Sequence, residues 1–132
     1  MELRVEVAGE LPPAKGEAKS MLSLGHSQQE RVRRLLTAAS DAMLDRELLL
    51  GDIAMEVTVS APTHHQLPDA TNMLGGIGDV LQARSTGADL EHLGPLAEVA
   101  CFQDDAQIQK VDYQRVRSDD VGYAIVIRSL SE

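Results

Sequence analysis

The sequence predicts a single domain of the α/β (α+β) class, in which a small mixed sheet of about four strands has two main helices packed on it. Three observations predict this class: segments that alternate apolar and polar residues, segments that repeat apolar residues at helical spacing, and the element order β-α-β-α-β-β. The 132 residues suffice for one hydrophobic core. Residues 1–132 are therefore predicted to form one domain.

The chain begins with a predicted strand. Apolar residues occupy every second position across residues 3–7, which is the pattern of a half-buried strand, and the strand is expected to end near Gly9. Residues 10–24 contain two adjacent prolines and predict an irregular loop. This loop is either a solvated connection or a segment that passes over a site.

The first predicted helix follows this loop. Ser27 and Glu30 have the order of a capping box, so the helix is expected to begin next to them. Its apolar residues make one stripe at helical spacing, which predicts one buried face. They are Val32, Leu35, Leu36, Ala39 and Met43.

Alternation returns across residues 53–59 and predicts a second strand. Pro62 ends it, because proline has no amide hydrogen to donate to a neighbouring strand. His64 and His65 then lie in a short loop. They are either polar loop residues or ligands near a metal.

Residues 67–81 predict the second helix, because their apolar residues recur at helical spacing and Asp69 or Thr71 can cap the first turn. The predicted helix contains three glycines, at positions 75, 76 and 78. Each costs about 0.8–1.0 kcal/mol relative to alanine. The glycines leave one face of the helix without side chains. This cost implies that either another backbone or a ligand approaches that face closely.

The remaining residues predict an insertion and two strands. Residues 84–96 are polar and rich in turn residues, with one short helical turn, and are interpreted as an insertion. Residues 107–117 and 123–127 predict the last two strands. The turn residues at 118–122 favour a hairpin between these two strands.

Composition restricts the function and the compartment. The formal net charge is −9, and residues 51–132 hold thirteen acidic residues against five basic ones, so nucleic-acid binding would have to rest on local basic patches. No apolar run approaches the roughly 20 residues that span a bilayer, and the N-terminal residues lack the order of a signal peptide. Cys101 is the only cysteine and cannot form an internal disulfide. A cytoplasmic protein without a membrane partner is expected.

Three aspartates are candidates for chemistry. Asp69 ends the loop after a strand, Asp79 lies inside the second helix, and Asp105 immediately precedes another strand. If the fold brings them together, their repulsion favours a cation, and carboxylate oxygens favour Mg²⁺ or Mn²⁺. Such a metal activates water and stabilises charge on a phosphodiester. The alternative is that these residues only cap helices and turns.

The motif order resembles one known family. The Pro-Asp-Ala-Thr-Asn sequence at 68–72, the Asp-Val-Leu at 79–81, the Asp-Asp-Ala-Gln-Ile at 104–108 and the strand that follows them resemble the RusA family of Holliday-junction resolvases. The prolines of the loop after the first strand resemble the opening of that family. The match in element order extends over nearly the whole chain.

The resemblance implies a homodimeric, Mg²⁺-dependent endodeoxyribonuclease that cuts branched DNA. It implies that Asp69 and Asp105 are catalytic carboxylates that bind the metal, with Asp79 and Asp104 as further acidic metal ligands. It also implies that Asn72, with Thr71 beside it, organises the site. Lys15 and Lys19 in the loop at 10–24 are the candidate DNA contacts.

The chain departs from the family pattern at two positions. Thr71 stands where the family has a second aspartate, and Gly75 stands where it has a lysine. These replacements remove a metal ligand and a positive group that stabilises charge on the phosphate. Three readings remain open: a divergent RusA-like nuclease, a RusA-fold homodimer that binds DNA or a protein without cleaving, and a protein-interaction module.

Overall fold

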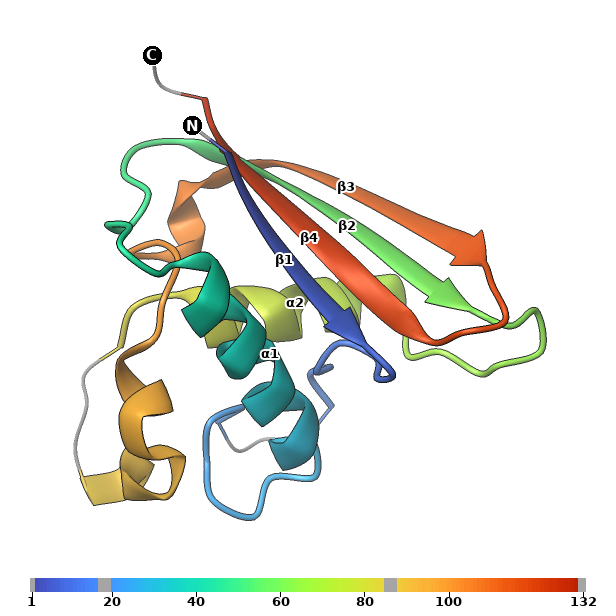
Figure 1. Ribbon diagram of the computed structural model, residues 1–132, viewed down its shortest axis with the longest axis horizontal. Helices are drawn as coiled ribbons and strands as arrows, with labels where there is room; N and C mark the ends of the chain where they lie inside the picture. Colours follow the sequence, from blue (N-terminus) through green and yellow to red (C-terminus); the bar gives the residue numbers. More distant parts are fainter. Residues whose placement is uncertain (1, 17–19, 85–87, 131–132) are drawn as a thin grey trace.

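The computed structural model describes residues 2–16, 20–84 and 88–130, and it has the predicted mixed α+β architecture (Figure 1). The elements occur in the predicted order, with two 3-10 helical segments, η1 and η2, added before the third strand. They are β1 (Glu2–Ala8), α1 (Gln29–Ala42), β2 (Ile53–Ala61), α2 (Ala70–Leu81), η1 (Ala88–Glu98), η2 (Asp105–Gln107), β3 (Ile108–Arg117) and β4 (Gly122–Ser129).

The four strands form one sheet in the order β1-β4-β2-β3. β4 runs antiparallel to both β1 and β2, and β3 runs parallel to β2. The predicted hairpin between β3 and β4 is therefore wrong, because β2 lies between them. Tyr123, Ile125 and Ile127 of β4 are almost fully buried and its other apolar residues are half-buried, which suits the centre of a sheet, whereas the polar and exposed β3 suits an edge.

The hydrophobic core lies on one face of the sheet, where α1 and α2 pack (Figure 1). In β1 the residues facing the helices are buried and the alternate residues are exposed, as the period-two pattern predicted. The helices contribute the apolar stripes expected from their spacing. The fully buried helix residues are Val32, Leu35, Leu36, Ala39, Met73, Ile77, Val80 and Leu81.

The predicted capping box of α1 does not form. The helix begins at Gln29, and Gln28 occupies the N-cap position without a side-chain cap hydrogen bond. Instead, the Gln28 side chain accepts a hydrogen bond from the amide of Ala14 at 3.2 Å. This contact ties the start of α1 to the loop after β1.

The segment interpreted as an insertion packs on the domain. η1 is interrupted at Gly94, where φ is 58°, and its Leu93 is buried in the core. The Arg84 guanidinium donates to the carbonyls of Ala97 and Val99 at 2.9 and 2.7 Å. In the described part of the chain, no helix has both the length and the apolar character that crossing a membrane requires.

Candidate functional site

The bare face of α2 is covered by the backbone of the loop that follows β1. A Cβ placed on Gly76 would lie only 2.2 Å from the carbonyl oxygen of Pro13. The amide of Lys15 also donates to the carbonyl of Asn72 at 3.0 Å. Of the two reasons predicted for the glycines, close approach of a backbone is the one the structure shows at Gly76.

This loop is not a solvated connection where it crosses α2. Residues 11–14 are buried, and the chain emerges at Lys15. The backbone of the loop lies over α2 at Gly76, and the exposed side chain of Lys15 extends from there to Asp79. Lys19 lies outside the described residues.

Lys15 fills the space above Gly75. A Cβ at position 75 would lie 3.1 Å from Cδ of Lys15, so the aliphatic stem runs along the glycine surface. The ammonium nitrogen then lies 3.0 Å from a carboxylate oxygen of Asp79. The side chain of Lys15 remains 52% exposed and that of Asp79 27% exposed, so both groups are accessible from solvent.

The sequence at 104–107 folds into a capped turn that leads into β3. The Asp104 carboxylate accepts from the amide of Ala106 at 2.9 Å, and the side-chain oxygen of Gln107 accepts from the amide of Asp104 at 3.0 Å. The amide group of Gln107 donates to the carbonyls of Leu49 and Gly51. Asp104 thus has the capping role of the alternative prediction, and Gln107 fastens the turn to the segment before β2.

Asp105 projects from this turn toward α2. Its Cβ would lie 3.8 Å from a Cβ placed on Gly78, and its amide donates to the side-chain oxygen of Gln82 at 3.1 Å. Partial loss of solvent, a hydrogen bond to Asp104 and the charges of Asp104 and Asp79 raise the pKa of Asp105. The charge of Lys15 acts in the opposite direction on this pKa.

Four charged residues therefore meet at one end of α2, and we refer to Lys15, Asp79, Asp104 and Asp105 as the Lys15 cluster. They come from the loop after β1, from α2 and from η2. The structure brings together three of the four aspartates that the sequence proposed as metal ligands. It adds a lysine that the sequence proposed only as a DNA contact.

Asp69 does not join the Lys15 cluster. It occupies the N-cap of α2, is exposed, and makes no side-chain cap hydrogen bond. The helical rise of about 1.5 Å per residue separates it by roughly 13 Å from Gly78, against which Asp105 packs. Two carboxylates that hold one Mg²⁺ at about 2.1 Å must lie much closer together. In this arrangement a single ion cannot bridge Asp69 and Asp105.

The other candidate residues lie on the surface near the start of α2. Thr71 and Asn72 are exposed in its first turn, and the backbone carbonyl of Asn72 holds the loop at Lys15. His64 and His65 are exposed, and the carbonyl of His65 accepts from Arg115 at 3.1 Å. Among the residues that the structure describes, no three His, Cys, Asp or Glu side chains are placed to hold one metal ion.

Sequence reasoning missed the pairing of Lys15 with Asp79 and the contact of Gln82 with Asp105. The glycine at position 75 was the available signal, because it left room for a side chain from elsewhere in the chain. No protein-family model matches this sequence, and no curated protein matches it either. The functional argument therefore rests on the fold and on the Lys15 cluster.

Proposed function

We propose that the protein is a divergent RusA-like, metal-dependent endodeoxyribonuclease that acts on branched DNA of the Holliday-junction type, as a cytoplasmic homodimer. The position of Lys15 is the observation that carries this proposal. The RusA pattern has a lysine where this chain has Gly75, and the stem of Lys15 lies in the space that a side chain at position 75 would enter. The loop after β1 thus supplies an ammonium group at the place where the pattern lacks one.

The carboxylates beside Lys15 fit a hard divalent cation. Mg²⁺ commonly binds through one or two carboxylates together with waters and substrate phosphates, so Asp79 and Asp105 suffice as protein ligands. Partial burial and the neighbouring charges of Asp104 and Asp79 raise the pKa of Asp105, and a bound cation would offset the repulsion between these charges. Asp79 and Asp105 would hold Mg²⁺ or Mn²⁺, which when bound would stabilise charge on the phosphodiester and activate water.

The residues of the chain have separate roles in this proposal. Lys15 is half exposed, so its ammonium can donate to a phosphate oxygen while its stem stays on Gly75. Gln107 and Gln82 hold the turn that presents Asp105. Asp69, at the other end of α2, has no part in this arrangement unless DNA extends along the helix.

Cleavage of a four-way DNA junction in Mg²⁺ or Mn²⁺ tests the proposal. We expect metal-dependent cleavage by the wild type and a loss of at least about 10- to 100-fold for Asp105→Asn, because the change removes a metal ligand and loss of a group that merely supports a ligand already costs that much. Asp41→Asn is the matched control, since Asp41 is an exposed aspartate on α1. Cleavage that survives Asp105→Asn unchanged would exclude the Lys15 cluster as the site.

The separation of Asp69 from Asp105 favours a second candidate function, in which the homodimer binds a DNA structure or a protein partner without cutting. In that case Lys15 neutralises Asp79 permanently and takes the place of a metal ion. This candidate predicts salt-sensitive binding of the junction with no cleavage in either metal. Metal-dependent cleavage by the purified protein would refute it.

A further inference from the structure

β3 forms one edge of the sheet and has little cover on either face. Nearly all of its residues are exposed, including two apolar ones, Val111 at 44% and Val116 at 36%. It pairs with β2 along one side only, so the other side presents unpaired backbone donors and acceptors. A long exposed edge strand of this kind is a template for pairing with another strand.

The opposite edge of the sheet, β1, has arginine contacts at both of its ends. On β1, the carbonyl of Glu2 accepts from the guanidinium of Arg46 at 3.0 Å, and the carbonyl of Ala8 accepts from Arg34 at 3.4 Å. No arginine in the described part of the chain donates to the backbone of β3. Arginine side chains thus contact the backbone at the β1 edge, whereas the backbone at the β3 edge remains open to pairing with another strand.

We propose that two copies of this chain associate through antiparallel pairing of β3 with β3, with Val111 at the two-fold axis. This inference deepens the homodimer part of the proposed function by naming its interface. An axis perpendicular to the sheet continues the two sheets as one and keeps all helices on the same face. Under this symmetry each residue faces a partner residue on the same side of the sheet.

The charges along β3 select the register. With Val111 on the axis, Lys110 lies directly opposite Asp112 of the partner subunit, and the same pair forms twice. A shift of the axis to Asp112 or to Lys110 would place two like charges opposite each other. Val111 would meet the partner's Val111, so its exposed apolar surface would be buried on the helix side of the joined sheet.

The ends of the strand agree with an antiparallel arrangement. Acidic residues, Asp104 and Asp105, precede β3, whereas its last residue is the exposed Arg117. Antiparallel pairing about Val111 brings Asp105 toward Arg117 of the partner subunit, whereas parallel pairing would bring like charges together. Asp119 and Asp120 follow in the turn after β3, beyond this pair. Because the axis is perpendicular to the sheet, both Lys15 clusters lie on the helix side of the dimer.

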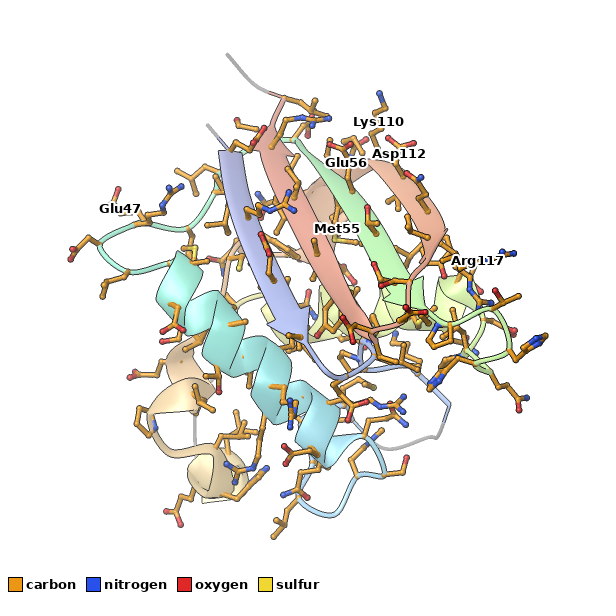
Figure 2. The ribbon with its side chains drawn as sticks, turned by 45° about the vertical axis from the view of Figure 1, so that its right-hand side comes forward. Glu47, Met55, Glu56, Lys110, Asp112 and Arg117 are labelled. Carbon is orange, nitrogen blue, oxygen red and sulfur yellow. The ribbon has the colours of Figure 1, made fainter. Side chains whose placement is uncertain are left out.

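Charge exchange at the proposed interface tests the inference. Figure 2 shows Lys110, Asp112 and Arg117 spread along β3 at one side of the molecule and Glu47 at the opposite side. By light scattering after gel filtration, the wild type should have twice the 14.3 kDa mass of the chain. Lys110→Asp and Asp112→Lys should each return the mass to that of one chain, and the double variant should restore the dimer.

Glu47→Lys is the control, because it makes the same change of charge as Asp112→Lys at an exposed position away from β3. It should stay dimeric, and circular dichroism should show every variant folded. A monomeric wild type, a single variant that remains dimeric, or a double variant that remains monomeric would each overturn the interface. Junction cleavage is measured separately, so a cleaving monomer contradicts only the interface and a dimer that does not cleave contradicts only the nuclease.

Discussion

Lys15 and Gly75 form a complementary pair, in which a long side chain from a loop occupies the space that a glycine leaves on a helix. The stem of Lys15 lies 3.1 Å from the point where a Cβ at position 75 would stand, and its ammonium pairs with Asp79. The positive charge of the Lys15 cluster is thus carried by the loop after β1. Moving that charge onto α2 is a direct test of its role.

The double substitution Lys15→Ala/Gly75→Lys should recover junction cleavage that Lys15→Ala alone loses. The alanine vacates the surface of α2, so a lysine at position 75 can enter the freed space and reach Asp79, one helical turn later. Rates of cleavage of the three proteins, at one Mg²⁺ concentration, measure the effect. A double variant as inactive as Lys15→Ala would show that the loop itself is needed beyond its charge.

Removing the charge of Asp105 should stabilise the fold at neutral pH. Partial burial, a hydrogen bond to Asp104 and the charges of Asp104 and Asp79 raise the pKa of Asp105 above its usual 3.8, so the folded state opposes its ionisation. The stability associated with this group is therefore present at pH values below about 4 and is lost as the pH rises through the higher pKa of the folded state.

The measurement is the melting temperature of the wild type and of Asp105→Asn between pH 3.5 and pH 7. Asp105→Asn should melt at the higher temperature at pH 7, and the difference should vanish toward pH 3.5. Asp41→Asn serves again as the control and should show no such trend. A wild type that is more stable than Asp105→Asn at pH 7 without metal would contradict the proposed repulsion in the Lys15 cluster.

At the scale of elements, α2 combines a buried apolar stripe with a glycine face on which another segment lies. The sequence was sufficient to predict the helix and its buried residues, because the apolar spacing is regular. The sequence was also sufficient to predict that a backbone or a ligand lies close to the glycine face. It did not identify the covering segment, because 62 positions separate Pro13 from Gly76 and no local signal joins them.

Gly76→Ala should destabilise the protein by about 1–3 kcal/mol, although alanine favours a helix, because the new methyl group would collide with the Pro13 carbonyl. Gly75→Ala is the matched control. Its methyl group meets only the flexible stem of Lys15, so this variant should gain up to about 1 kcal/mol from helix propensity. Urea unfolding of both variants measures the difference. A Gly76→Ala variant as stable as Gly75→Ala would contradict the close packing of the loop.

The two C-terminal strands show where local signals mislead. Residues 118–122 have turn character, and adjacent strands joined by a short turn commonly pair, which favoured a hairpin. The buried apolar residues of β4 instead place this strand between β1 and β2, and the turn crosses the end of β2, where the Ser118 amide donates to the Ala61 carbonyl at 3.1 Å. The burial of the apolar residues of β4 between β1 and β2 thus outweighed the tendency of the turn at residues 118–122 to form a hairpin.

For the whole molecule, the fold class followed from the order and period of the elements, but the order of strands in the sheet did not. Strand order depends on which apolar faces can be covered at once, and that is a property of the assembled domain. The positions of the candidate site residues likewise depend on the assembled domain and could not be predicted from the sequence. The sequence left open whether Asp69, Asp79 and Asp105 converge. In the structure the charge of Asp79 acts on Asp105, whereas Asp69 is kept apart by the length of α2.

The parallel pairing of β2 with β3 has a consequence for the order of folding. Parallel strands need a crossover, and here the crossover contains α2, so Asp79 and Asp105 belong to one β-α-β unit. Lys15 belongs to a segment 64 positions before Asp79 and arrives by a longer chain closure. We therefore expect the two aspartates to come together earlier in folding than Lys15 reaches them, so that docking of the loop after β1 would relieve the repulsion between the aspartates.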